Sequence, residues 1–253
     1  MILDQFKLDG KVAVVTGAGR GPGQGAALGF AEAGADLALV DIVSTKETAA
    51  SVRALGRRVV EIHADLMDRA DIQPLVERIV GDLGGIDILL NNAGIIRRAA
   101  FLEFTEKDWD EVIQLNQSAV FFLSQAAARR MVEQGRGGKI INIASMLSFQ
   151  GGIRVPSYTA SKSAVMGLTR LMANELAPHH INVNAVAPGY MATDNTAPLR
   201  ADPARSAEIL ARLPAGRWGL PDDLRGAMVF LASAASDYVT GCTLAVDGGW
   251  LCR

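Results

Sequence analysis

Residues 12–31 read VAVVTGAGRGPGQGAALGFA, and this stretch decides the fold. An apolar run ends at Val15, a glycine-rich turn spans Thr16 to Gly23, and a helical run of small residues follows. A strand, a glycine turn and a helix in this order form a cradle for a pyrophosphate. Glycines let the backbone approach closely, and the helix N-terminus presents free N–H groups to the negative charge. The stretch predicts a dinucleotide-binding unit, and its plain alternative is an ordinary glycine-rich turn.

The next strand-like run, Leu37 to Val40, ends in Asp41. A carboxylate at this distance from the glycine turn suits a hydrogen bond from a ribose 2′-hydroxyl, and its charge repels a 2′-phosphate. Arg20 instead favours NADP, because a guanidinium beside the glycine turn could pair with the 2′-phosphate of that cofactor. We give Asp41 precedence because it excludes a dianion by charge and by occupied space. The predicted cofactor is therefore NAD. Arg20 could then be a solvated surface residue.

Strand-like and helical runs alternate along the whole chain. This alternation predicts an α/β Rossmann fold, with a doubly wound parallel sheet of about seven strands and helices on both faces. No linker or repeat interrupts it, so we expect one domain over residues 1–253. Further strands are expected at 58–64, 86–92, 139–144, 181–187 and 243–246, and helices at 72–83, 118–134, 158–177 and 222–234.

Composition and charge exclude several classes of function. A net charge of −2 indicates no positively charged surface of the kind that binds nucleic acid. No apolar run approaches the ~18 residues of a membrane span, and the N-terminus lacks a targeting pattern. Two cysteines and three histidines, none at ligand spacing, form neither a disulfide framework nor a zinc site. We therefore expect a cytoplasmic, metal-free protein with no nucleic-acid or membrane partner.

A candidate acid–base pair lies in the run Tyr158-Thr159-Ala160-Ser161-Lys162. A tyrosine ionises near pH ~10, so it needs help to exchange protons at neutral pH. A lysine four positions later shares its helix face, and its ammonium favours the phenolate. The pattern alone could be a helix surface, but the motifs described above and below occur at compatible places.

Notable polar and small residues follow the predicted strands, at the edge where ligands bind in such sheets. Asp65-Leu66 follows the third strand, where the carboxylate could accept from an adenine amino group. The run from Asn91 to Gly94 ends the fourth strand, Ser145 ends the fifth, and residues 188–193 follow the sixth. We expect these strand ends to converge on one crevice.

Taken together, these motifs resemble the short-chain dehydrogenases/reductases of the single-domain type. The resemblance spans nearly the whole chain, and the matching positions are Thr16–Gly23, Asn91–Gly94, Asn116, Ser145, Tyr158, Lys162, Pro188-Gly189 and Asp247–Gly249. Four segments are also similar to the members that act on deoxy sugar acids: residues 145–158, 187–196, 214–219 and 246–251.

The resemblance implies four catalytic residues. Tyr158 would exchange the alcohol proton while a hydride moves between the substrate carbon and the nicotinamide. Lys162 would hold the ribose and keep the pKa of the phenol low, and Ser145 would hydrogen-bond the reacting oxygen. Asn116 would hold a water that relays protons from Lys162. The structural alternatives are a backbone-bonding asparagine for Asn116 and a cap for Ser145.

Cofactor contacts are also implied by the resemblance. The expected residues are Gly17, Arg20, Gly21, Pro22, Gly23, Asp41, Asp65, Leu66, Asn92, Ala93, Gly94, Tyr158, Lys162, Pro188, Gly189, Met191 and Thr193. Pro22 departs from the aliphatic residue usual in the family and removes one N–H from the loop. Its fixed φ still suits the first turn of a helix, so we expect weaker binding at worst.

A sugar-acid substrate carries a carboxylate, which calls for a guanidinium near the crevice. Arg98 and Arg154 are favoured for this role, beside Ser145 and Tyr158 at the reacting oxygen. Gln150 and Ser148 are candidates for the hydroxyls. Residues 192–213, rich in Asp, Arg and Pro, are expected to form a mobile lid over the substrate.

The resulting prediction is an NAD-dependent oxidoreductase that interconverts a secondary alcohol and a ketone on a six-carbon deoxy sugar acid in uronate or pectin breakdown. The resemblance also implies a homotetramer. Two alternatives keep the chemistry with another substrate: a gluconate 5-dehydrogenase and a 3-oxoacyl-carrier reductase. A third, of another class, is a dinucleotide-sensing protein without catalysis.

Overall fold

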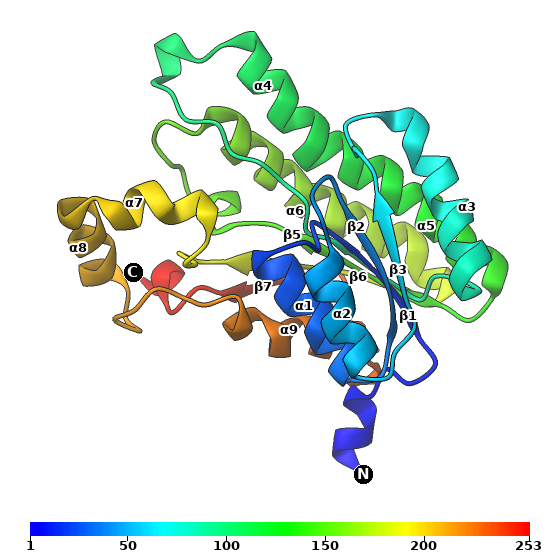
Figure 1. Ribbon diagram of the computed structural model, residues 1–253. Helices are drawn as coiled ribbons and strands as arrows, with labels where there is room; N and C mark the ends of the chain where they lie inside the picture. Colours follow the sequence, from blue (N-terminus) through cyan, green and yellow to red (C-terminus); the bar gives the residue numbers. More distant parts are fainter.

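A computed structural model describes residues 1–253 and shows one parallel sheet of seven strands. The strands lie in the order β3-β2-β1-β4-β5-β6-β7 (Figure 1). Their bounds are Val12–Thr16 (β1), Asp36–Asp41 (β2), Val59–His63 (β3), Ile88–Asn91 (β4), Gly138–Ile143 (β5), Ile181–Pro188 (β6) and Thr243–Val246 (β7). The predicted fold class is confirmed.

The strand order reverses beside β1, and this reversal sets the position of the site. From β1 to β3 the chain adds strands on one side, and it then returns to place β4 on the other side of β1. The loops that leave β1 and β4 therefore run to opposite faces and open a crevice at their carboxyl ends.

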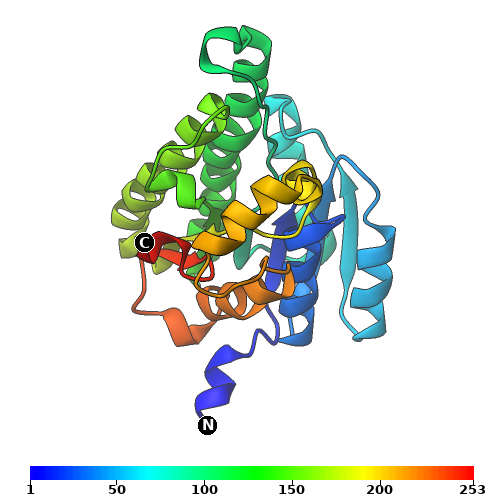
Figure 2. The ribbon, with the colours of Figure 1, turned by 90° about the vertical axis from the view of Figure 1, so that its left-hand side faces the viewer.

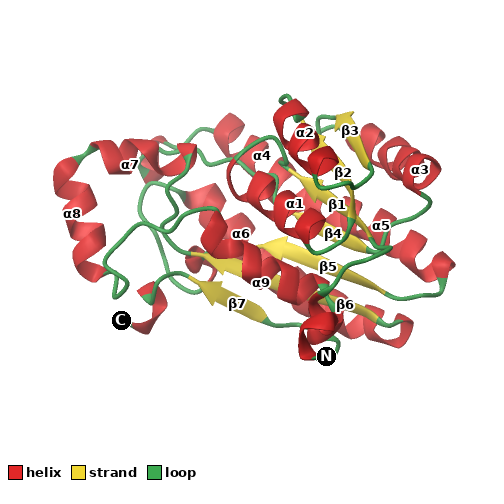
Figure 3. Ribbon diagram, turned by 60° about the horizontal axis from the view of Figure 1, so that its bottom comes forward, coloured by secondary structure: helices red, strands yellow, loops and turns green.

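Helices cover both faces of the sheet, because alternate residues of each strand point to opposite faces. In β1, Val12 and Val14 pack into one buried cluster with α3, α5 and α6, whereas Ala13 and Val15 pack into another with α1, α2 and α9. Figure 3 shows the sheet with helices around it. The long helices are α1 (Gly21–Glu32), α2 (Lys46–Ala54), α3 (Ile72–Leu83), α4 (Glu106–Ile113), α5 (Val120–Gln134), α6 (Pro156–Leu176), α8 (Pro203–Arg212) and α9 (Asp222–Ala232). None of the helices is long and apolar enough to cross a membrane.

Short helical turns complete the fold. The five-residue helix α7 covers Ala197–Ala201, and 3₁₀ turns lie at Ile2–Phe6, Arg69–Asp71, Phe101–Glu103, Met146–Ser148, Ala177–His179, Asp194–Thr196, Ala234–Ser236 and Trp250–Cys252. A π-helical turn, Gln114–Ala119, joins α4 to α5. The predicted helix at 118–134 is therefore the second part of a longer helical segment that starts at Glu106 and is interrupted by this wider turn.

The segment predicted as a lid, residues 192–213, contains α7 and α8 and will be called the lid segment. It lies beyond the carboxyl ends of β5, β6 and β7, away from the layers that cover the sheet (Figures 1 and 2). Ile209 and Leu213 of this segment are buried in a small apolar cluster with Met146 and Trp250. The lid segment is thus docked by its own apolar contacts, and its mobility stays a prediction.

Candidate active site

A cavity of about 1340 Å³ opens at the carboxyl ends of the strands and will be called the strand-end cavity. It is lined by the glycine turn, by the loops that follow β2 to β6, by α6, by the lid segment and by Trp250. The predicted convergence of strand ends on one crevice is therefore seen in the structure.

The glycine turn places Gly17, Arg20, Gly21 and Pro22 along this cavity. Gly23 does not line it: a Cβ atom there would lie 2.0 Å from the carbonyl oxygen of Gly17. Gly23 thus lets α1 pack closely against the end of β1, and its predicted contact with the cofactor stays a prediction. Pro22 lies in the first turn of α1, where its missing N–H would have had no partner within the helix.

Asp41, at the end of β2, is held in place by the backbone. Its two carboxylate oxygens accept from the N–H of Gly19 at 2.8 Å and of Val43 at 3.1 Å. Arg20 is turned toward the lid segment, where Nη1 lies 2.8 Å from Oδ2 of Asp194, and both side chains are largely exposed. The acidic group therefore has a fixed position at the cavity, whereas the neighbouring guanidinium already has a partner.

The loops after β3 and β4 form the next part of the wall. Asp65 and Leu66 line the cavity, and the Asp65 carboxylate accepts from the N–H of Met67 at 3.0 Å. Asn92 Nδ2 donates to the carbonyl oxygens of Thr16 at 2.9 Å and Gly17 at 3.2 Å. This amide ties the β4 loop to the glycine turn, so the two loops form one continuous wall.

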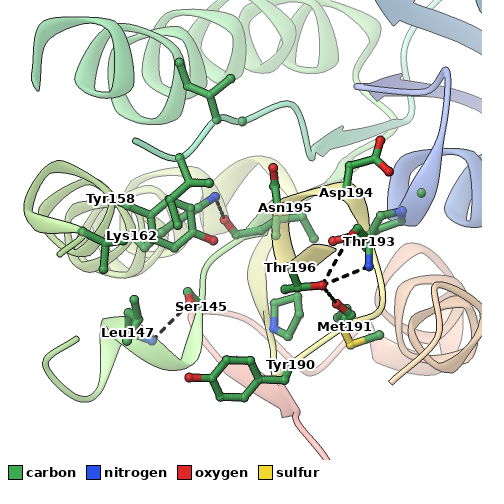
Figure 4. A pocket seen from close by; sticks show the side chains of 18 of the residues that line it. Ser145, Leu147, Tyr158, Lys162, Tyr190, Met191, Thr193, Asp194, Asn195 and Thr196 are labelled. Atoms are coloured by element: carbon green, nitrogen blue, oxygen red, sulfur yellow. Dashed lines mark hydrogen bonds between the residues drawn. The ribbon is translucent and has the colours of Figure 1, made fainter. Parts of the chain in front are cut away.

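Ser145, Tyr158 and Lys162 lie together on one side of the cavity, opposite Thr193 to Thr196 (Figure 4). Ser145 follows β5, and its hydroxyl accepts from the N–H of Leu147 at 3.1 Å. That bond occupies a lone pair and leaves the hydroxyl proton free to be donated. Lys162 is 4% exposed, and its Nζ donates to the carbonyl of Ile143 at 2.5 Å.

Burial dominates the electrostatics of the pair on α6. It raises the pKa of the Tyr158 phenol, and a hydrogen bond with Ser145 and the charge of Arg98 act in the opposite direction. Burial also lowers the pKa of the Lys162 ammonium to about 8, which leaves it charged at neutral pH. The structure differs here from the prediction of a phenol pKa kept low by Lys162, because the burial of the ring outweighs the groups that lower it.

Asn116 does not line the cavity and is fully buried in the π-helical turn. Its Oδ1 accepts from the N–H of Ile95 at 2.9 Å, and its Nδ2 donates to the Ile95 carbonyl at 2.9 Å. A weaker contact of 3.4 Å joins Nδ2 to the Ser161 hydroxyl. Asn116 therefore clamps the loop after β4, and its proton-relay role stays a prediction.

The residues predicted to bind the substrate fall into two groups. Arg98, Gln150 and Arg154 line the cavity, and no carboxylate lies within ion-pair distance of either guanidinium. Arg98 Nη2 donates to the carbonyl of Asn195 in the lid segment at 2.8 Å, and partial burial lowers the pKa of this arginine. Ser148 does not line the cavity, and its hydroxyl donates to the Lys162 carbonyl at 2.6 Å, so its contact with substrate hydroxyls stays a prediction.

Arg154 has a backbone φ of 64°, in the left-handed region that non-glycine residues rarely adopt. Its carbonyl accepts from the N–H of Ala99 at 3.2 Å. This bond joins the loop that carries Arg154 to the loop that carries Arg98. The two guanidiniums therefore reach the same cavity from joined loops.

The lining residues that were not predicted as site residues include Tyr190, Arg212 and Trp250. The guanidinium of Arg212 lies 4.0 Å over the Trp250 ring, and its Nη2 donates to Gln150 Oε1 at 3.2 Å. Tyr190 packs edge-on against Trp250, with ring centroids 4.7 Å apart. Tyr190 could have been found from its place directly after Pro188-Gly189, whereas Arg212 carries no local signal.

Comparisons with known proteins agree with this geometry. A family model described as Enoyl-(Acyl carrier protein) reductase matches residues 17–251. The 2-dehydro-3-deoxy-D-gluconate 5-dehydrogenase of Escherichia coli (strain K12) is 67% identical over 253 residues, which cover 100% of both chains.

Solved structures are similar over nearly the whole chain. A protein of Agrobacterium tumefaciens, provisionally named a 2-deoxy-D-gluconate 3-dehydrogenase and solved with bound NADP, is 52% identical, with a TM-score of 0.94 over 98% of this chain and 99% of that one. A gluconate 5-dehydrogenase from Burkholderia cenocepacia J2315, in complex with NADP and tartrate, is 42% identical, with a TM-score of 0.94 over 100% of both chains.

Proposed function

Because this chain belongs to the short-chain dehydrogenase/reductase family, we propose that it acts as a 2-dehydro-3-deoxy-D-gluconate 5-dehydrogenase, also called 2-deoxy-D-gluconate 3-dehydrogenase. It interconverts a secondary alcohol and a ketone on a deoxy sugar acid. The observation that carries this proposal is a single cavity that holds Tyr158 and Ser145 together with two guanidiniums that lack a carboxylate partner. Full-length similarity to relatives of that name supports it.

The cavity wall fits a nicotinamide dinucleotide. The pyrophosphate would lie against Gly17 to Pro22, the adenosine ribose beside Asp41, and the adenine beside Asp65 and Leu66. Asn92, Ala93, Gly94, Pro188, Gly189, Met191 and Thr193 would line the nicotinamide half. When bound, this cofactor supplies the hydride acceptor or donor at its nicotinamide ring.

The acid–base step uses three side chains of this protein. In the oxidation direction Tyr158 takes the proton of the substrate hydroxyl, and in the reduction direction it returns that proton. Ser145, whose proton is not used by the bond from Leu147, donates to the reacting oxygen and holds it beside Tyr158. Lys162 keeps a positive charge near the phenol at neutral pH, with Nζ 5.7 Å from the centre of the Tyr158 ring.

The substrate carboxylate is assigned to Arg98 and Arg154. Two cations that face one cavity and have no carboxylate within ion-pair distance favour an anionic ligand, because its charge relieves their mutual repulsion. Gln150 lines the same cavity, and its amide can bind a hydroxyl group. This arrangement supports a sugar acid over an acyl-carrier substrate, whose reacting carbon lies far from any carboxylate.

Turnover with different acids tests the proposal. We expect NAD reduction with 2-dehydro-3-deoxy-D-gluconate, and NADH oxidation with its ketone product. We expect a kcat/KM at least about tenfold lower with D-gluconate, which carries hydroxyls at C2 and C3 in place of the ketone and the methylene group. The rates with the two acids are measured with purified protein from the absorbance of NADH. Preference for D-gluconate would move the substrate assignment to a gluconate dehydrogenase, and silence with both acids would overturn it.

For the cofactor we propose NAD, because the fixed carboxylate of Asp41 lies where a 2′-phosphate would be placed. Asp41→Asn removes the charge and keeps an oxygen for the backbone donors. The ratio of kcat/KM with NAD to kcat/KM with NADP should fall by about 10- to 100-fold, the equivalent of a charged hydrogen bond. Steady-state kinetics with both cofactors measures the change.

A double variant controls for the neighbouring cation. Adding Arg20→Ala to Asp41→Asn should lower kcat/KM with NADP again, since Arg20 is the guanidinium nearest in sequence to this end of the cavity. An unchanged cofactor ratio in Asp41→Asn would contradict the role of the carboxylate.

We also propose a homotetramer that works in uronate or pectin breakdown. Apolar side chains of α5 and α6 that are not fully buried support the assembly: Leu171 is 48% exposed, and Phe121 is half-buried. Exposed apolar residues on neighbouring long helices favour contact with another subunit.

A further inference from the structure

We propose that Ser148 is a positioning residue of this active site: its hydroxyl joins the turn that carries Ser145 to the helix that carries Tyr158 and Lys162. The inference rests on the catalytic roles given to those three residues in the proposed function. It assigns to Ser148 a part in catalysis although its side chain does not touch the strand-end cavity.

The hydroxyl of Ser148 makes two hydrogen bonds in opposite directions. It donates to the backbone carbonyl of Lys162 at 2.6 Å, and it accepts from the backbone N–H of Ser145 at 3.3 Å. A hydroxyl has one proton to donate, so these two bonds give it one orientation. Ser148 is 8% exposed, and water therefore offers little replacement for either bond.

A second bond closes a ring between the end of β5 and α6. Lys162 Nζ donates to the carbonyl of Ile143 at 2.5 Å, and Ile143 lies two residues before Ser145. The ring runs from Ile143 along the chain to Ser145, through Ser148 to the Lys162 backbone, and through the Lys162 side chain back to Ile143. Lys162 is therefore held at both its backbone and its ammonium.

The bond to Lys162 is not needed to satisfy the helix. A carbonyl inside an α-helix accepts from the N–H four residues later, and Lys162 lies well inside α6 (Pro156–Leu176). The contribution of Ser148 is therefore geometric: it sets how far the Ser145 turn stands from α6. Misplacing a reacting group by about 1 Å can cost about 100-fold in rate, so this distance matters to turnover.

Three variants, with a fourth held in reserve, separate positioning from folding. Ser148→Ala removes the hydroxyl, and Ser148→Thr keeps it. Ser236→Ala is the matched control: Ser236 is fully buried, and its hydroxyl bonds the carbonyls of Leu231 and Ser233 at 3.1 Å, outside the lining of the cavity. Ser148→Cys keeps the size of the side chain with a weaker donor and replaces the alanine variant if that one does not fold.

Two readouts test the proposal. We expect kcat of Ser148→Ala to fall about tenfold with the KM for NAD little changed, because the Ser145 turn moves relative to α6 while the glycine turn and Asp41, on other elements, keep their place. Ser148→Thr should restore most of kcat, and Ser236→Ala should keep it while losing thermal stability.

The second readout does not depend on the substrate. The chain has three tyrosines, so ¹³C labelling of the phenol ring gives three signals, of which Tyr158 is assigned by its phenylalanine variant. The Ser145 hydrogen bond lowers the pKa of this phenol, so we expect its titration in the NAD-bound protein to move to higher pH in Ser148→Ala. The other groups that act on Tyr158, namely Lys162 and Arg98, are present in every variant.

Equal kcat and an equal Tyr158 titration in wild type and Ser148→Ala would overturn the proposal. A shifted Tyr158 titration in Ser148→Ala, together with no turnover of either sugar acid by the wild type, would support the role of Ser148 and refute the proposed substrate. The two failures are therefore distinguishable.

Discussion

The Tyr158→Phe variant is expected to lose turnover by about 10²- to 10⁴-fold while it still binds NADH, the range that a general acid–base contributes. The substitution removes one oxygen from a half-buried ring and keeps the ring contacts of α6. Without the phenol, the substrate hydroxyl has no proton acceptor beside Ser145. Steady-state rates and NADH fluorescence titration measure the two quantities separately.

A matched variant controls for the loss of a tyrosine. Tyr238 is fully exposed and does not line the strand-end cavity, so Tyr238→Phe should keep wild-type rates and wild-type NADH binding. If Tyr158→Phe also kept its turnover, the acid–base assignment would be refuted. A protein that only senses a dinucleotide would instead show NADH binding in all variants and no turnover in any.

The Gly23→Ala variant is expected to lose NADH binding and to unfold at a lower concentration of denaturant. The added Cβ would lie 2.0 Å from the Gly17 carbonyl oxygen and 2.5 Å from Nδ2 of Asn92, both shorter than any normal contact. The start of α1 must then move away from the glycine turn and from the β4 loop. We expect a loss of about 1–3 kcal/mol in the free energy of unfolding, the usual cost of overpacking.

Gly29→Ala, in the same helix, is the control for this prediction. Gly29 is also buried, but its added Cβ would meet Arg225 and Val229 at 3.5 Å, an ordinary contact distance. Alanine is favoured over glycine inside a helix by about 0.5–1 kcal/mol, so this variant should be as stable as wild type or more stable. Equal urea midpoints for the two variants would contradict the role of Gly23.

The sequence by itself determined the sheet, its helices and the residues at the strand ends. All seven strand positions could be predicted, because alternation and apolar runs are local patterns that follow from the geometry of a strand. The Tyr158 and Lys162 pair was equally visible, since four residues bring two side chains to one helix face. Glycine turns are local too, and their place after β1 predicted the cavity wall.

Tertiary structure alone decided which distant groups meet. Arg212 contacts Gln150 and Trp250 only because α8 docks on an apolar cluster beside the β5 loop. Ser148 was predicted to face a substrate, yet its hydroxyl joins the Ser145 turn to the Lys162 carbonyl. The direction in which the pKa of the Tyr158 phenol moves likewise depends on how deeply packing buries it, because desolvation raises this pKa and the neighbouring charge lowers it. Local spacing carries no information about such contacts, since their distances depend on how separate elements pack.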